Sequence, residues 1–208
     1  MARLRDPYGM ALEGLRAGLR AGRFGLGAPL VAAELAPTLS VSATPLREAL
    51  SRLAGEGLLE DRRGRGYLTH RLEPGELEDL YGAHWACTSA ALKFKRRGHA
   101  VLDIRLKSGD HDALAVRDQT EALFNAILGA GENDVLTALH QRITDRLALV
   151  RYFEPGVIGD CADELLELAG LWDGAASARL TKALGLFHQR RITRSKSLSA
   201  ALRHLRQH

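Results

Sequence analysis

The sequence predicts a mainly α-helical protein in two parts, a small domain that ends in a β-hairpin and an all-α bundle. A capped apolar segment at 44–54, separated by a glycine break from an arginine-rich hairpin at 58–69, indicates the first part. Apolar residues at helical spacing from residue 76 onward, without strand-like alternation, indicate the second. With 208 residues the chain can form two domains, which we expect at 1–71 and 72–208.

Segment 41–69 organises the first domain and reads VSATPLREALSRLAGEGLLEDRRGRGYLT. Ser42 and Thr44 are favoured capping residues, and Pro45 suits the first helical position, where a missing N–H costs nothing. The apolar stripe of the predicted helix consists of Leu46, Ala49, Leu50 and Leu53. Arg47 falls on a different face, so we expect this helix to pack on one side and to present a cation on another.

The predicted hairpin is rich in arginine. Its first strand begins at Leu58, and the chain turns through Arg63, Gly64 and Arg65 before it returns. A helix start beside a basic hairpin is the outline of a winged helix-turn-helix, in which the helix docks in the major groove and the hairpin contacts phosphates. The same local pattern also occurs in proteins that bind no nucleic acid, so by itself it leaves both interpretations open.

Two more helices are expected in the first domain, at 8–21 and 31–39. Pro37 lies inside the second, where it removes a backbone hydrogen bond and clashes with the preceding turn, so this helix should be short or bent. After a linker at 71–75, the bundle helices are expected at 76–97, 113–129, 134–153, 160–172 and 175–202.

Charge is unevenly distributed along the chain. The net charge is +4 over 1–71, −8 over 72–173 and +8 over 174–208. This pattern suggests that both ends face a polyanion, although solvated surface charge is the interpretation we favour for the tail. No apolar run approaches the roughly 18 residues that span a membrane, and the first residues lack the apolar core of a signal peptide. We therefore expect a soluble cytoplasmic protein, with Cys87 and Cys161 as reduced core residues.

The segment VSATPLREALSRLAGEGLL with the following RRGRG resembles the DNA-binding domain of the GntR regulators, above all their FadR-like branch. The resemblance covers about the first third of the chain well and the remainder loosely. It implies a DNA-binding surface and a close approach of the hairpin backbone to DNA at Gly64. The DNA-binding residues that we expect are Ser42, Thr44, Arg47, Arg62, Arg63, Gly64 and Arg65.

Three positions depart from the family's pattern. Ala43 stands where an arginine is usual, Ala33 where the second helix often carries an arginine, and Ser40 where a glycine precedes the turn. A missing guanidinium removes the commonest reader of guanine. We therefore expect phosphate contacts to dominate, with Arg47 as the remaining recognition-helix arginine.

The second part resembles the FCD ligand-sensing domain of the same branch, and LEDLYGAHWACTSAAL is similar to its opening helix. That domain often holds a metal through an Asp and a His four residues apart and two later histidines. The matching positions here are Glu121, Asn125 and Asp163, with His188 one turn beyond the fourth. This oxygen-rich set does not suit zinc; it could hold a harder cation weakly or form hydrogen bonds with an organic ligand. We expect no metal or other cofactor.

His84 aligns where the family commonly carries an arginine that pairs with a carboxylate effector, and imidazole would be a weaker, switchable anchor. The implied effector site comprises His84, Glu121, Asn125, Asp163 and His188. The alternative, which we favour for each residue taken singly, is a satisfied polar group in the bundle or an exposed helix position. His140 is expected to lie next to the core.

No nucleophile elbow, zinc-protease motif, P-loop or dinucleotide-binding glycine run is present, so the sequence gives no case for an enzyme. We expect a sequence-specific transcriptional regulator that binds a double-stranded DNA operator as a homodimer, without a membrane, under the control of a carboxylate-like small molecule. The alternative is a ligand-binding or scaffold protein whose degenerate winged helix binds DNA without sequence preference. Ala33, Pro37 and Ala43 motivate it.

Overall fold

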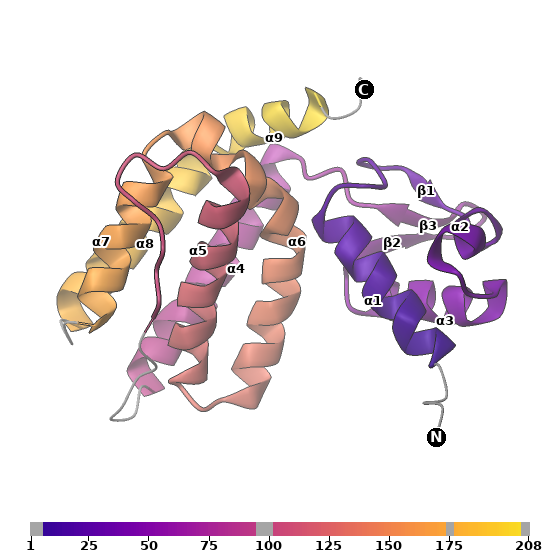
Figure 1. The fold of residues 1–208 in the computed structure, drawn as a ribbon, viewed down its shortest axis with the longest axis horizontal. Coiled ribbons are helices and arrows are strands. Elements are labelled where there is room, and N and C mark those ends of the chain that lie inside the picture. Colours follow the sequence, from indigo (N-terminus) through magenta and orange to yellow (C-terminus); the bar gives the residue numbers. More distant parts are fainter. Residues whose placement is uncertain (1–5, 95–101, 174–176, 205–208) are drawn as a thin grey trace. The chain divides into compact units, whose positions relative to one another are not determined.

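The computed structural model describes residues 6–94, 102–173 and 177–204, shown as a ribbon in Figure 1. The described residues are mainly helical and include one small antiparallel sheet. They form two compact units, divided between Arg71 and Leu72. Within the described ranges, no helix combines the length and apolar character needed to span a bilayer.

The first unit contains three helices and three short strands. In chain order these are α1 (Pro7–Arg20), β1 (Pro29–Leu30), α2 (Ala32–Leu39), α3 (Ala43–Gly55), β2 (Leu59–Arg62) and β3 (Gly66–Thr69). The sheet order is β1-β3-β2, and both pairings are antiparallel. The predicted stripe of α3 is buried against α1, since Leu46, Leu50 and Leu53 join Ala11 and Leu15 in one apolar core. The sheet and α3 are thereby fixed in one compact body.

Two glycines of α1 permit close packing. A Cβ atom on Gly14 would lie 2.7 Å from a methyl carbon of Leu39, and one on Gly18 would lie 2.5 Å from the ring of Phe24. Both distances are shorter than real carbon contacts. These glycines lower the intrinsic stability of α1, but they allow α2 and the loop that follows α1 to pack closely against it.

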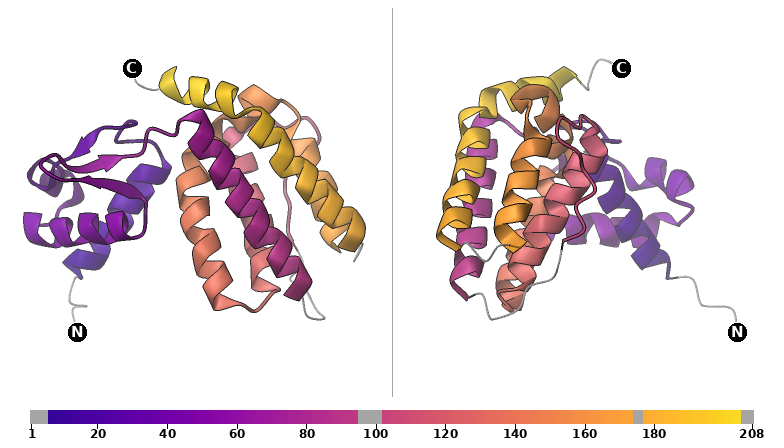
Figure 2. Two further views of the ribbon diagram at one scale, coloured as in Figure 1. Left: turned by 180° about the vertical axis from the view of Figure 1, so that it is seen from behind. Right: turned by 60° about the vertical axis from the view of Figure 1, so that its left-hand side comes forward.

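The second unit contains only helices within its described residues. They are α4 (Pro74–Phe94), α5 (Ala113–Gly129), α6 (Asp134–Ile158), α7 (Cys161–Asp173), α8 (Ser177–Thr193) and α9 (Ser195–His204). Helices α4 to α8 run alongside one another, and α9 crosses one end of the bundle (Figure 2). Phe124, Trp172 and Phe187 are buried in the apolar core between them. Both cysteines are buried free thiols, as predicted.

Two predicted helix boundaries were wrong. The helix expected at 175–202 is interrupted after Thr193, and α9 starts at Ser195, whose buried hydroxyl donates to Glu78 on α4. The helix expected to end at 153 continues to Ile158. Pro155 lies in its last turns, where the loss of one backbone hydrogen bond does not end a helix that is packed on its neighbours. The end expected at 97 for the first bundle helix lies outside the described residues.

Candidate functional site

The start of α3 is exposed and carries free polar groups. Ser42 is the N-cap residue, as predicted, but its side chain does not make the expected capping hydrogen bond. Pro45 is the third helical residue rather than the first, still within the turn whose N–H groups have no acceptor inside the helix. The exposed hydroxyl groups of Ser42 and Thr44 therefore lie beside unpaired backbone N–H groups, an arrangement that suits phosphate.

Arg47 projects from the first turns of the same helix. Its neighbour Leu46 is fully buried, whereas Arg47 itself is exposed. Arg47 forms no ion pair with any residue that the structure describes. Its guanidinium is consequently available to a partner outside the chain.

The hairpin of β2 and β3 forms the wing. Arg65 N–H donates to Arg62 C=O at 2.8 Å, and Gly64 takes a φ of 76° at the third turn position, which favours glycine. Arg62 Nε donates to Glu60 at 2.7 Å, so its charge is partly neutralised. Arg63 and Arg65 are exposed and have no ion-pair partner within the described ranges. The two turn arginines are therefore the free cations of the wing.

The turn between α2 and α3 contains a residue in a left-handed conformation. Ser40 ends α2 with a φ of 54°, and it stands where the resembling family carries glycine. A side chain is disfavoured at such a φ. Helix α2 has only eight residues, which agrees with the short helix expected from Pro37.

The second unit has a polar centre built from four helices. Three of the expected effector residues are buried, His84 on α4, Glu121 on α5 and His188 on α8. Asn125 is exposed, and Asp163 is exposed on α7, where it accepts a hydrogen bond from Ser108. The structure thus groups some of the expected residues and leaves Asn125 and Asp163 at the surface.

Two further members of this centre were not assigned to a site from the sequence. His140 and Arg151, both on α6, are 1% exposed, and each lies within hydrogen-bond distance of His84 Nε2. Together with Thr144 they recur on one buried face of α6, among apolar residues such as Leu147 and Ala148. That polar periodicity was the available signal, because a buried arginine rarely lacks a partner.

Hydrogen bonds fix the tautomers of two of the histidines. His188 Nδ1 lies 2.6 Å from the carbonyl oxygen of Leu184 and must donate to it, which leaves the Nε2 lone pair. This lone pair accepts from His84 Nδ1 at 2.7 Å. His84 Nε2 is then an acceptor, and it lies 2.7 Å from Arg151 Nη2 and 2.9 Å from His140 Nε2. We call His84, His140, His188 and Arg151 the histidine cluster.

The histidines of this cluster are neutral at neutral pH. Burial, followed by the charge of Arg151, lowers the pKa of His84 well below its ordinary value and that of His140 to about 3. Burial also lowers the pKa of His188 to about 3. The aromatic ring of Phe124 packs edge-on against His84 with centroids 4.5 Å apart, so the surroundings are apolar as well as cationic.

A second buried network ties α4, α6, α7 and α8 together. Tyr81 donates to Glu154 Oε1 at 2.5 Å, and Arg191 Nε donates to Glu154 Oε2 at 2.8 Å. Arg191 Nη1 also donates to Glu164 at 2.7 Å. Because every partner is charged or hydrogen-bonded, this network is a structural connection among the helices.

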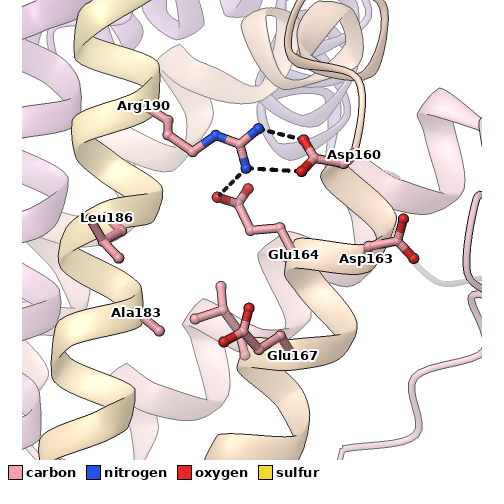
Figure 3. Close-up of a pocket in the computed structure, with 8 residues that line it drawn as sticks. Asp160, Asp163, Glu164, Glu167, Ala183, Leu186 and Arg190 are labelled. Atoms are coloured by element: carbon pink, nitrogen blue, oxygen red, sulfur yellow. Dashed lines mark hydrogen bonds and ion pairs between the residues drawn. The ribbon is translucent and has the colours of Figure 1, made fainter.

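An open pocket of about 260 Å³ lies between α7 and α8. Arg190 reaches from α8 to Asp160 and Glu164 across its mouth (Figure 3). The hydrogen bond from Arg190 lowers the pKa of Asp160. Asp163 and Glu167 also line this pocket, so Asp163 belongs to an acidic surface rather than to the histidine cluster.

The exposed α3 start and the basic wing place the chain in a class of proteins, those with a winged helix-turn-helix domain followed by an all-α bundle. Residues 7–68 match the family described as bacterial regulatory proteins, gntR family. The first unit therefore carries the domain that this family model describes.

Two curated relatives agree with this assignment. The Nta operon transcriptional regulator of Aminobacter aminovorans is 28% identical over 130 residues, which cover 58% of this chain and 62% of that protein. An uncharacterized HTH-type transcriptional regulator in the TAR-I ttuE-ttuC' intergenic region of Agrobacterium vitis is 29% identical over 117 residues, or 56% of this chain and 65% of its own. The chain thus spans less than two thirds of the length of either relative. Both are named as transcriptional regulators.

Solved structures share the fold over nearly the whole chain. A GntR transcriptional regulator from Rhodococcus sp. RHA1 superposes with a TM-score of 0.72 at 15% identity, covering 92% of this chain and 98% of that one. McbR/YncC of E. coli gives a TM-score of 0.67 at 15% identity, with 93% and 99% covered. These similarities confirm the predicted fold class, a winged helix followed by a helical bundle.

Proposed function

We propose that this regulator binds a double-stranded DNA operator as a homodimer through its first unit, and that its second unit senses a small carboxylate-like effector. The observation that carries the DNA-binding part is the exposure of three unpaired guanidinium groups, Arg47 on α3 and Arg63 and Arg65 on the wing, in one compact unit.

In the proposed complex, α3 enters the major groove with its N-terminal end and the wing lies along the phosphates. Ser42, Thr44 and the free N–H groups of the first turn contact phosphate, as do Arg63 and Arg65. Arg47 contacts a base edge. Gly64 lets the wing backbone approach the DNA, and Arg62, held by Glu60, contributes less than its neighbours.

The proposed homodimer is supported by the general geometry of helix-turn-helix recognition. Two recognition helices that dock on one face of DNA lie about 34–36 Å apart, so each protomer reads half of a symmetric site. An effector that binds one arrangement of the protomers better than another shifts the population and changes this spacing. Regulation then requires no contact between effector and DNA.

The histidine cluster is the proposed effector site. It contains two of the residues expected from the sequence, His84 and His188, and Glu121 lies nearby, 3.8 Å from Arg151. Asn125 and Asp163 are left out because both are exposed. The cluster offers the charged donors of one buried guanidinium, Arg151, beside neutral imidazoles and an apolar ring, and a small carboxylate is bound by donors of this kind.

The test is selection of genomic fragments bound by the purified full-length chain, with the Arg47→Ala variant as the matched control. We expect enrichment of fragments with a two-fold symmetric motif whose half-sites are one helical turn apart. A gel shift that depends on salt but not on sequence would instead support the alternative, a scaffold or ligand-binding protein with a degenerate winged helix.

A further inference from the structure

The histidine cluster can be compared with the metal site that the FCD resemblance implies. That site needs an acidic residue and a histidine four residues apart on one helix, together with later histidines. In this structure Glu121 is buried, but Asn125 at the fourth following position is exposed, and Asp163 bonds Ser108 on the surface. The residues at the matching positions do not converge and do not fit a metal.

The three buried histidines form a different donor set, and it does not fit a metal either. A metal ion binds imidazole through a nitrogen lone pair. The lone pair of His188 accepts from His84 Nδ1 at 2.7 Å, and the lone pair of His84 faces Arg151 Nη2 at 2.7 Å. A guanidinium stays protonated in proteins, so it must donate at this position. The place where a divalent cation would sit beside His84 is therefore taken by a fixed positive charge.

Two of the three nitrogen atoms of the Arg151 guanidinium have no hydrogen-bond partner among the described residues. The residue is 1% exposed, and neither its Nε nor its Nη1 has a hydrogen-bond acceptor among the residues that the structure describes. The carboxylate of Glu121 forms an ion pair with Nη1 at 3.8 Å, but this distance is too long for a hydrogen bond. Buried donors on a charged group are costly to leave unpaired. The missing partner has to be an acceptor, and a negatively charged one fits best.

A third polar side chain on α6 lies on the same face. The hydroxyl of Thr144 is buried and has no hydrogen-bond partner within the described ranges. Thr144 lies one helical turn from His140 and two turns from Arg151, so the three share one side of the helix. This hydroxyl can donate to the same acceptor that the guanidinium lacks.

We propose that Arg151 takes the place of the metal ion in this bundle, and that the histidine cluster binds a small oxyanion directly on its guanidinium without any metal. The inference rests on the proposed effector-sensing function and specifies its ligand chemistry. The anion replaces His84 Nε2 as the acceptor of the hydrogen bond from Arg151 Nη2. It also accepts hydrogen bonds from Nη1 and from the hydroxyl of Thr144. Because Glu121 remains 3.8 Å from the guanidinium, a single negative charge is preferred over two. A monocarboxylate is the class that meets these conditions.

The test uses the full-length protein, labelled with ¹⁵N at histidine and dialysed against a chelator. Two-bond ¹H–¹⁵N correlation spectra report the tautomer and the ligation state of each ring, with assignments from single histidine variants. Sodium acetate, sodium phosphate, zinc chloride and nickel chloride are added separately, and the melting temperature is measured in parallel. The variants are Arg151→Met and, as the matched control, Arg142→Met, an exposed arginine on the same helix.

We expect acetate to shift the His84 resonances and to raise the melting temperature, with a weaker response to phosphate. Equimolar zinc or nickel should leave the resonances of His84, His140 and His188 unchanged. Arg151→Met should lose the acetate response and gain at least tenfold in zinc affinity, because it frees the lone pair of His84, while Arg142→Met should behave as the wild type.

Stoichiometric shifts of the three histidines with zinc or nickel in the wild type would overturn the proposal, as would the absence of any response to both acetate and phosphate. These wild-type outcomes decide the matter even if Arg151→Met does not fold. DNA binding by the same metal-free sample is measured separately. Failure there would contradict the regulator function, and failure of the anion titration would contradict only this inference.

Discussion

Arg191 Nε donates to Glu154 Oε2 at 2.8 Å, and both side chains are almost completely buried. The same guanidinium donates to Glu164 and stacks with its central carbon 3.2 Å from the centre of the Phe187 ring. One arginine on α8 thus holds carboxylates from α6 and α7. The bundle therefore depends on a buried ionic network as well as on its apolar core.

Replacement of Arg191 by methionine should strongly destabilise the bundle. The change keeps much of the side-chain volume but leaves Glu154 and Glu164 without their shared cation, and breaking a buried ion pair costs about 3–5 kcal/mol. Urea unfolding followed by circular dichroism measures this loss. The matched control is Arg190→Met, which removes a more exposed partner of Glu164 and should cost about 1 kcal/mol or less. Equal losses in the two variants would contradict the structural role assigned to Arg191.

The histidine cluster should make stability depend on pH. The pKa values of His140 and His188 in the folded chain, about 3, lie below the unfolded value of about 6.5. Between these limits the unfolded chain binds protons that the folded chain does not. The free energy of unfolding should therefore be maximal above about pH 6.5 and fall toward pH 3, by about 1.4 kcal/mol per pH unit for each histidine.

Urea unfolding at several pH values tests this dependence. His140→Gln should reduce the slope between pH 4 and 6 by the contribution of one histidine. If His140→Gln has the same slope as the wild type, His140 is not buried in its neutral form.

The wing arginines should govern the salt dependence of DNA binding. Arg63→Ala and Arg65→Ala should each weaken binding to all sequences and reduce the slope of log K against log salt concentration by about 1, since each removes one phosphate contact. Fluorescence anisotropy at several salt concentrations measures the slope. Arg62→Ala should change it less, because Glu60 already neutralises Arg62. Unchanged slopes in both turn variants would show that the wing does not contact phosphate.

The turn before α3 should be stabilised by glycine. Ser40 has a φ of 54°, so Ser40→Gly relieves an unfavourable backbone conformation and should raise the free energy of unfolding by about 0.5–1 kcal/mol. Ala33→Gly, at an exposed helical position of α2, should lower it by about 1 kcal/mol. Thermal unfolding compares the two. A loss of stability in Ser40→Gly would mean that the serine makes a compensating interaction.

Helical periodicity and turn chemistry were sufficient to predict most of the fold. The stripe of Leu46, Leu50 and Leu53 and the glycine turn of the wing are local patterns, and the structure places them as predicted. The break between α8 and α9 could not be predicted in the same way. No proline or glycine marks it, and the buried hydrogen bond from Ser195 to Glu78 joins residues far apart in the sequence.

The candidate sites were predictable to different degrees. Exposed cations such as Arg47 follow directly from the pattern of a single helix. The histidine cluster does not, because His84, His140 and His188 come from three helices whose relative rotation is set by packing. Arg151 was not assigned to a site because its partner His84 lies on another helix, and only the packing of α4 against α6 brings the two side chains together.

The central claim is that Arg47 and the wing together make a sequence-specific DNA surface. The most direct measurement compares a selected genomic fragment with its shuffled counterpart at one salt concentration, for the wild type and Arg47→Ala. The quantity is the dissociation constant for the shuffled fragment divided by that for the selected fragment. We predict a wild-type ratio of about 10³ or more. The variant should lose about 1–3 kcal/mol of the difference in binding free energy between the two fragments, so its ratio should be smaller. A wild-type ratio near one, or the same ratio in both proteins, would contradict the account.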